Sequence, residues 1–448
     1  MTKRCVMVIL ALLWSACSAS AERPLVIRNV TIIAGDGSPA HSGMSVLIVN
    51  GQIKKIASSS HLKIPANAKT LDAQGKYLIP GLWNMHVHLG AYAEGKRALA
   101  EYLAEGITGV RDMGSPLEDI LRLRKETAEG SITGPDMVVA GPIVQGPLPF
   151  KQPVFISVKD ESEAQQTVDA LHTSDVDFIK VQDAIPHNIY LAAAKQAHKD
   201  GLTFVGHIPP TVLPEEASDL GQHSIEHMGG RFWGVLIGSS KEEAALHAEE
   251  AQLYKDILNA LDHHNPPPLT NMQAAFTRRL IESYDGAKAT ALIARFKKND
   301  TWQCPTLVAL RTLWVGDAQY SKEDLFWADK VIAKNASFIP LMQKQGIGLL
   351  AGTDLPPNAK GGTIQDELAA LVDAGLTPMQ ALQAATIQPA RFLKRTHTEG
   401  SIKIGKTANL VLLETNPLDD IHNTTRIAAV VLHGRIVVPP QLLDSGKE

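Results

Sequence analysis

Cysteine is scarce in this chain, and neither sign of charge dominates it. Three cysteines occur in 448 residues, and two of them, Cys5 and Cys17, lie in an N-terminal segment that we expect to be removed. Only Cys304 then remains, which excludes an intrachain disulfide. The 43 basic and 47 acidic side chains give a net charge of −4, so the sequence offers no electrostatic attraction for nucleic acid.

The first 21 residues have the organisation of a signal peptide. Lys3 and Arg4 precede an apolar run over 6–14, and Ala-Ser-Ala at 19–21 offers a cleavage site of small residues. Its removal changes the net charge from −4 to −6, and no later segment is apolar enough to cross a bilayer. We therefore expect an exported protein, periplasmic or secreted, with no membrane span. A lipoprotein attached through Cys17 and a buried first helix are the less favoured alternatives.

Both ends of the chain are rich in strand patterns and lack helical ones. Alternating apolar residues occupy 25–33, 45–49 and 52–56, and Asn50-Gly51 between the last two predicts a tight hairpin. The same style returns at 409–413 and 428–438. We expect residues 22–79 and 401–448 to form one small β-sandwich domain.

The middle of the chain, residues 80–400, alternates short apolar runs with helical patterns. Such alternation predicts a parallel sheet with helical crossovers. Eight units in one domain of this length are typical of an α/β fold of the (β/α)8 TIM-barrel type, with a doubly wound open sheet as the alternative. Residues 238–300 break the rhythm and predict a helical insertion after the sixth strand, which could act as a lid. The expected strands are 82–85, 109–111, 137–140, 178–181, 203–205, 224–225, 306–308 and 348–351.

Several of these runs end in residues that can bind metal. His86 and His88 are two residues apart, so in a strand they share one face. The fourth run contains Lys180, whose unpaired ammonium would be costly to bury. The fifth, sixth and eighth runs are followed by His207, His227 and Asp354, respectively. A lone histidine is more often structural, and Asp354 alone would be a turn residue. In a barrel, however, all these strand ends meet at one mouth.

The chain resembles the amidohydrolase superfamily, and in particular its secreted binuclear branch with imidazolonepropionase-like enzymes and Xaa-Pro dipeptidases. The resemblance covers nearly the whole mature chain. It rests on the segments 80–88, 178–181, 206–207, 225–227, 351–354, 374–378, 384–386 and 400–406.

This resemblance implies two divalent metal ions, with Zn2+ favoured by nitrogen and oxygen donors. His86, His88 and Asp354 would hold the more buried ion. His207 and His227 would hold the more exposed one, and Lys180 would bridge both as a carbamate formed with CO2. Carboxylation answers the buried-lysine problem because it converts a cation into an anionic ligand.

The implied function is hydrolysis of a C–N amide bond by a metal-bridging hydroxide. Asp354 would accept the hydroxide proton and return it to the leaving nitrogen. The expected substrate is a dipeptide, an N-acyl amino acid or a similar small amide, with a lactone or cyclic amide as the runner-up. The loop 141–147 departs from the dipeptidase pattern because it contains no histidine, and Asn409 stands where the family commonly has aspartate.

Two rival interpretations share these residues. His223-Ser224-Ile225-Glu226-His227 matches His-x-x-Glu-His, the inverzincin metallopeptidase motif, which requires a helix. A non-catalytic metal-binding barrel is the other rival, although a purely structural site would not need Asp354.

The substrate end of the site has one candidate, Arg231, which follows His227 across two glycines. Its planar guanidinium suits a substrate carboxylate, although a solvated loop arginine is the more common case. The sequence is compatible with a homo-oligomer and predicts no macromolecular partner.

Overall fold

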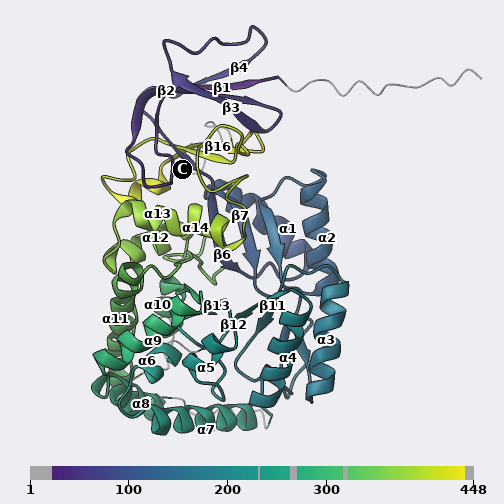
Figure 1. Ribbon diagram of the computed structural model, residues 1–448, viewed down its shortest axis with the longest axis vertical. Coiled ribbons are helices and arrows are strands. Elements are labelled where there is room, and N and C mark those ends of the chain that lie inside the picture. The colour runs from purple at the N-terminus through teal and green to yellow at the C-terminus, as the bar shows by residue number, and fades with distance from the viewer. Residues whose placement is uncertain (1–22, 231–232, 263–269, 316–320, 439–448) are drawn as a thin grey trace, which may run out of the picture.

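The computed structural model describes residues 23–230, 233–262, 270–315 and 321–438. A strand-rich unit built from both chain ends lies at one end of the molecule, and a larger body of helices and parallel strands makes up the rest (Figure 1). Within the described residues, no helix combines the length and hydropathy needed to span a bilayer.

The two chain ends share a single sheet of eight strands, ordered β17-β16-β15-β5-β1-β2-β3, with β4 paired to β1. Its centre joins the ends of the chain directly, because β5 pairs with β15 in antiparallel register, Ile79 opposite Val411. Asn50 and Gly51 have φ of 49° and 73°, which confirms the predicted hairpin, since such turns need positive φ at both positions. The strands are β1 (Leu25–Ile32), β2 (His41–Val49), β3 (Gln52–Ser58), β4 (Lys69–Asp72), β5 (Tyr77–Pro80), β15 (Leu410–Leu413), β16 (Ile427–Leu432) and β17 (Arg435–Val438).

The apolar side chains of this sheet form their own core. Ile27, Val46 and Leu410 belong to one cluster of buried residues drawn from both chain ends. Alternate residues of each strand supply it, as the period of two along a strand requires. The ends therefore form one structural unit, whereas its packing as a two-layer sandwich remains a prediction.

The body contains two parallel sheets, one of three strands (β6-β7-β8) and one of six (β10-β9-β11-β12-β13-β14). Every pairing in them is parallel, so each connection needs a crossover. The strands are β6 (Leu82–Val87), β7 (Ile107–Asp112), β8 (Asp136–Val139), β9 (Ile143–Gln145), β10 (Phe155–Ser157), β11 (Phe178–Val181), β12 (Thr203–Gly206), β13 (Ser224–Glu226) and β14 (Trp302–Cys304).

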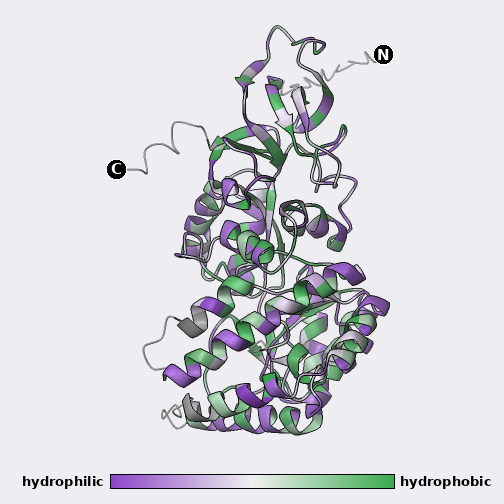
Figure 2. Ribbon diagram, turned by 90° about the vertical axis from the view of Figure 1, so that its left-hand side faces the viewer, coloured by the Kyte–Doolittle hydropathy of each residue, from purple (hydrophilic) through white to green (hydrophobic). Residues whose placement is uncertain are grey.

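Helices supply most of the crossovers and cover the parallel sheets (Figure 1), whereas β9 and β10 are joined without a helix. Hydrophobic and hydrophilic residues alternate along them, which fits helices that pack one face inward (Figure 2). The first five are α1 (Tyr92–Ala104), α2 (Leu117–Ala128), α3 (Glu161–Thr173), α4 (His187–Lys199) and α5 (Pro214–Asp219). This mixed α/β content with parallel sheets fits the predicted TIM-barrel class.

The predicted insertion coincides with a run of helices between β13 and β14. These are α6 (Gly234–Gly238), α7 (Glu243–Asp262), α8 (Thr270–Glu282) and α9 (Gly286–Lys298). Their role as a lid stays a prediction. The remaining helices are α10 (Leu307–Val315), α11 (Lys322–Gln345), α12 (Ile364–Asp373), α13 (Pro378–Ala384), α14 (Ile387–Phe392) and the 3-10 helix η1 (Ile421–Thr425).

The prediction of the seventh strand at 306–308 is wrong. The strand is β14, and it pairs with β13 so that Glu226 lies opposite Cys304. Leu307 begins α10 instead, because Glu367 accepts its backbone N–H at 3.1 Å and that of the next residue at 3.0 Å. The predicted eighth run, 348–351, forms an isolated parallel bridge between Gln303 and Leu349 rather than an assigned strand.

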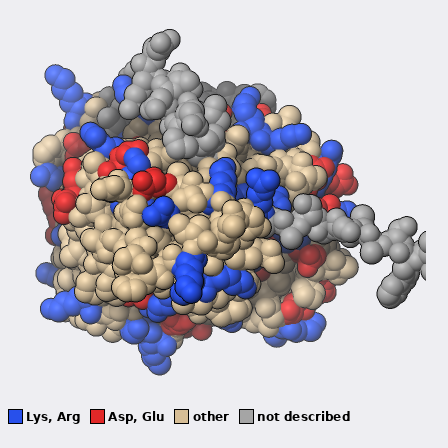
Figure 3. All heavy atoms as spheres, turned by 90° about the horizontal axis from the view of Figure 1, so that it is seen from above, with Lys and Arg blue, Asp and Glu red and all other residues tan. Residues whose placement is uncertain are grey.

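The surface shows no single-sign face where the molecule is viewed from the strand-rich end. Lys and Arg side chains and Asp and Glu side chains both occur across this face, with uncharged surface between them (Figure 3). The near balance of charges in the composition is thus visible on this face (Figure 3).

Candidate metal and active site

His86, His88 and Asp354 meet at the end of β6. The two histidines lie on one side of the strand, and their Nε2 atoms are 3.5 and 3.3 Å from Asp354 Oδ1. Asp354 is anchored to the same strand because its backbone N–H donates to the His86 carbonyl at 2.9 Å. The ligand atoms of all three residues lie within 4.8 Å of one another, which is close enough to hold a metal ion.

His207 and His227 lie at the ends of two other strands and extend this group. His207 follows β12 and His227 follows β13, and their ring centroids are 4.9 Å apart. The His227 ring lies 4.5 Å from that of His86, and its Nε2 is 3.4 Å from Asp354 Oδ2. Asp354 thus connects the two histidine pairs.

Lys180 is buried in β11, with 1% of its surface exposed. Gly206 on the neighbouring strand makes room for it, because a Cβ there would lie 3.1 Å from Lys180 Cδ and 2.2 Å from the Val181 carbonyl oxygen. Burial lowers the pKa of Lys180, although the negative charges of Glu226 and Asp354 oppose that shift. Burial thus favours the neutral amine at this position.

Each of the four histidines uses its Nδ1 atom in a hydrogen bond away from the centre of the group. Such bonds fix the ring orientation and leave Nε2 as the potential metal donor. Accordingly, His86 Nε2 is buried and has no hydrogen-bond partner among the described residues, as expected for a metal donor. The Nδ1 contacts are His88 with Gly114 O (2.8 Å), His207 with Asp183 Oδ1 (2.8 Å), His227 with Thr306 Oγ1 (2.5 Å) and His86 with Glu226 Oε2 (2.8 Å).

The electrostatics of the group match a site for cations. Burial lowers the pKa of His86 to about 4, so its imidazole is neutral near pH 7 and its lone pair is available. Burial would raise the pKa of Asp354, but the neighbouring His86 and His227 hold it well below its usual range. Neutral imidazoles around a carboxylate form a donor set suited to Zn2+ and related divalent ions.

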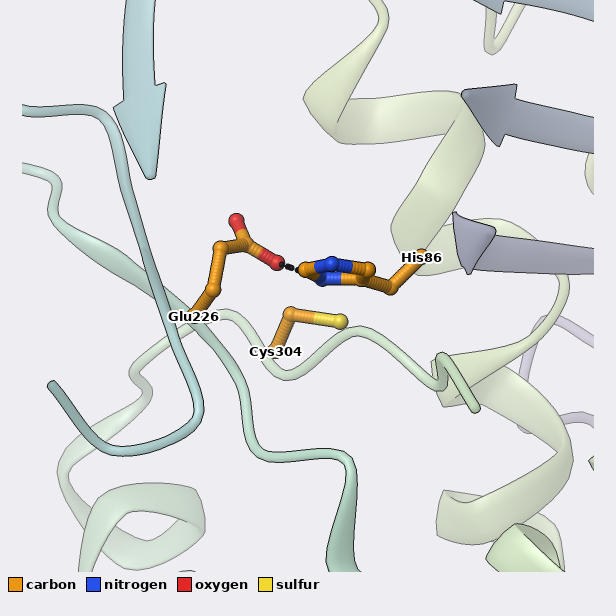
Figure 4. A group of neighbouring side chains, drawn as sticks. All are labelled: His86, Glu226 and Cys304. Carbon is orange, nitrogen blue, oxygen red and sulfur yellow. Dashed lines mark hydrogen bonds and ion pairs between the residues drawn. The ribbon is translucent and has the colours of Figure 1, made fainter. Parts of the chain in front are cut away.

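A second trio that could hold a metal, His86 with Glu226 and Cys304, lies deeper in the body (Figure 4). Two observations argue against a cation there. Arg111 Nη2 is 2.9 Å from both Glu226 carboxylate oxygens, so the Arg111 guanidinium already neutralises that carboxylate. Burial raises the pKa of Cys304 well above its usual value, which keeps the thiol protonated.

The structure therefore brings together five predicted ligands, and the charge of Asp354 is one of those that oppose the lowering of the Lys180 pKa by burial. These five are His86, His88, His207, His227 and Asp354. The predicted substrate residue, Arg231, lies outside the described residues.

The inverzincin interpretation is wrong, because Ser224–Glu226 is a strand and not a helix. His223 instead stacks on Phe392, with ring centroids 4.7 Å apart. Adjacent residues of a strand point to opposite faces, yet Glu226 and His227 both contact His86. The reason is that His227 has φ of 57°, so the alternation of the strand ends at Glu226.

Sequence reasoning missed the residues that orient the histidines, namely Arg111, Asp183, Glu226 and Thr306. The one available signal was Arg111, a charged side chain inside an apolar strand run, as Lys180 is. A buried arginine requires a buried acid, and Glu226 directly follows the sixth apolar run.

Comparisons with known proteins find similar sequences and similar folds. The model of the Amidohydrolase family matches residues 77–437. Ochratoxinase from Aspergillus niger is 36% identical over 439 residues, which cover 89% of this chain and 85% of that protein.

Two solved structures share the fold. A putative prolidase from Bifidobacterium longum superposes with a TM-score of 0.72 at 23% identity, covering 96% of this chain and all of the other. A Xaa-Pro dipeptidase with bound methionine superposes with a TM-score of 0.69 at 19% identity, covering 92% and 99% of the two chains.

Proposed function

The chain belongs to the amidohydrolase family, and from that premise we propose that it is a metal-dependent hydrolase that cleaves the C–N amide bond of a small substrate. The observation that carries the proposal is the arrangement of the four histidines. Their Nδ1 atoms all bond away from the centre, and the Nε2 atoms of His86, His88 and His227 lie beside Asp354. An exported location, directed by residues 1–21, is part of the same proposal.

The residues present fit two divalent ions, with Zn2+ favoured by the nitrogen and oxygen donors. His86, His88 and Asp354 would hold the more buried ion, and His207 and His227 the other. Bound ions of this kind polarise a carbonyl and lower the pKa of water enough to make a nucleophile at neutral pH. The unpartnered Nε2 of His86 supports the fit.

Lys180 would bridge the two ions as a carbamate. Its lowered pKa leaves the amine unprotonated more often than in water, and the neutral amine is the form that attacks CO2. The new N–C bond forms as the nitrogen loses a proton, which turns a neutral group into an anion. The product carries two oxygen donors in the space where a lysine ammonium would repel cations.

Asp354 is the proton carrier in this proposal. Its lowered pKa keeps it ionised at neutral pH, so it can accept a proton from the attacking water and donate it to the leaving nitrogen. His88 and His227 contact one carboxylate oxygen each and hold the group in place.

The substrate class is a dipeptide, an N-acyl amino acid or a related small amide. The loop 141–147 bears on this choice because it lacks the histidine of the dipeptidase pattern. Its one polar amide side chain, Gln145, is engaged in a structural bond, since its Oε1 accepts the Ala184 backbone N–H at 2.8 Å. A lactone or cyclic amide is the second candidate, because the same nucleophile attacks any activated carbonyl.

We further propose that the two parallel sheets are parts of one closed barrel over residues 80–400, beside a β-sandwich of 22–79 and 401–448. Hydrogen bonds that link the two sheets support closure. Asp177 N donates to Val139 O at 2.9 Å, which joins β8 to the start of β11. On the other side, Leu350 N donates to Gln303 O at 2.9 Å, and Met85 N donates to Ala351 O at 2.8 Å.

The test is a hydrolysis screen with the mature protein after metal reconstitution and after exhaustive chelation. Dipeptides, N-acyl amino acids and lactones are the substrates. We expect cleavage of at least one amide class, loss of that activity on chelation, and its return with Zn2+. Full activity in protein shown by elemental analysis to be metal-free would contradict the proposal.

A further inference from the structure

A buried ion pair between Arg111 and Glu226 lies directly behind His86. Both side chains are fully buried, and they come from β7 and β13, which are not neighbours in a sheet. Arg111 Nη2 donates to both Glu226 oxygens at 2.9 Å, and Nη1 donates to Ser224 Oγ at 3.0 Å. The guanidinium lies near the rings of Phe392 and Phe178, 5.2 and 5.8 Å from their centroids.

Stability alone is a weak reason for such a pair. Desolvating two charges offsets much of their attraction, and well-packed apolar residues of similar size often replace a buried pair without loss. The pair here instead contacts His86 and the residue just before it. Arg111 Nε donates to the Met85 carbonyl at 2.6 Å, which holds the backbone before His86, and Glu226 Oε2 contacts His86 Nδ1 at 2.8 Å.

The contact between Glu226 and His86 determines where the imidazole proton lies. An ionised carboxylate only accepts hydrogen bonds, so Nδ1 must carry the proton and Nε2 the lone pair. The opposite tautomer would direct the Nδ1 lone pair at the carboxylate. Nε2 then faces Asp354 Oδ1, 3.5 Å away, with no hydrogen bond of its own.

The other three histidines have different Nδ1 partners. His88 and His227 contact neutral oxygens, and the partner of His207 is Asp183, whose side chain is 11% exposed. His86 alone among the four is joined to a fully buried carboxylate that is itself held by an arginine. This difference singles out one of the two ions of the proposed site.

We propose that Arg111 and Glu226 are positioning residues that hold His86 in its Nδ1–H tautomer and aim Nε2 at the more buried metal. The consequence for metal binding rests on the proposed function, whereas the tautomer does not. Loss of such an outer partner typically lowers metal affinity by 10- to 100-fold. We expect the effect on the ion held by His86, with a smaller effect on the ion held by His207 and His227.

The experiment compares Glu226→Gln, Arg111→Met and the double variant with the parental chain. Metal affinity is measured by competition with a chelator, thermal stability by unfolding, and the His86 tautomer by 15N NMR of the metal-free protein. Parental protein should show the Nδ1–H form. In Glu226→Gln, Arg111 and Ser224 donate to the amide oxygen, so the amide NH2 faces His86 Nδ1. This variant should lose the Nδ1–H form and bind one ion about 10- to 100-fold more weakly.

The double variant separates positioning from support of the fold. Glu226→Gln leaves Arg111 as an unpaired buried charge, and the added Arg111→Met removes that charge. We therefore expect Tm to recover in the double variant while the affinity for the more buried ion stays low. Parallel recovery of both quantities would reduce the pair to a structural role. Arg124→Met is the matched control, because its partners Asp175 and Asp177 lie outside the site and its metal affinity should be unchanged.

Three further results would overturn the proposal. One is an Nε2–H tautomer of His86 in the metal-free parental protein, a measurement that needs no variant to fold. Another is parental affinity for both ions in Glu226→Gln. A third is a further ion lost on Cys304→Ala, which would make the deeper trio a metal site. A parental protein that binds no metal but shows the Nδ1–H tautomer would instead contradict the proposed function and support the positioning of His86.

Discussion

At the scale of single residues, strand alternation carried the prediction of the site. His86 lies in β6 and His88 follows its last residue, and both Nε2 atoms lie beside Asp354. Asp354 reaches them because its backbone bonds to His86. The orienting residues were harder to predict. Arg111 and Glu226 are separated by 115 positions, and their pairing depends on how distant strands are arranged, which local sequence patterns do not encode.

Asp354 is expected to act in proton transfer as well as in metal binding. Asp354→Asn keeps the size and one oxygen donor but cannot accept the proton, so kcat should fall by roughly 10²- to 10⁴-fold with little loss of metal. Steady-state kinetics and elemental analysis of the same preparation measure the two quantities. An unchanged kcat would transfer the role to another group.

Lys180 is expected to act through its carbamate. Lys180→Ala should lose activity and the more exposed ion, and short carboxylic acids should restore part of both, because a free carboxylate can occupy the vacated bridge. Titration of the variant with acetate or propionate, followed by activity and metal content, makes the measurement. Full metal content and an unchanged rate without added acid would argue against the carbamate.

At the scale of elements, most strands of the body follow the predicted apolar runs, and the exceptions have local causes. β14 has three residues, too few for a periodic signal, and Pro305 separates it from the apolar start of α10. The apolar pattern therefore predicted the strand after Pro305, whereas β14 lies before it. Glu367 fixes the start of α10 by accepting two backbone N–H groups, a tertiary contact from α12.

Glu367 predicts a pH dependence of stability. Burial raises its pKa to about 7 from an ordinary value of 4.5, so between these values the folded state binds a proton that the unfolded state has released. Its contribution to stability is full below about pH 4.5 and is lost as the pH rises through about 7. Glu367→Gln should flatten this part of the stability profile.

Urea unfolding of parent and variant from pH 4.5 to 7.5 measures this difference. Glu129→Gln, at an exposed end of α2 with 59% of its side chain accessible, serves as the control and should follow the parental profile. Parallel profiles for the parent and Glu367→Gln would show that the buried carboxyl does not titrate in this range.

At the scale of the whole molecule, the two chain ends are coupled through β5 and β15, and β6 follows β5 after a single residue. The terminal sheet is therefore continuous in sequence with the strand that carries His86. The strand-rich character of both ends was readable from alternation and turns. Their merging into a single eight-stranded sheet was not, because it depends on pairing between residues more than 300 positions apart.

The central claim is that this chain holds two divalent ions between its histidine pairs. The most direct measurement is the metal stoichiometry of the mature protein, purified without chelator, reconstituted with Zn2+ and CO2, and analysed by elemental analysis against protein concentration. The account predicts about two ions per chain, as a two-cation site requires. A stoichiometry that stays near one would remove the bridging role from Lys180, and a value near zero would contradict the metal site itself.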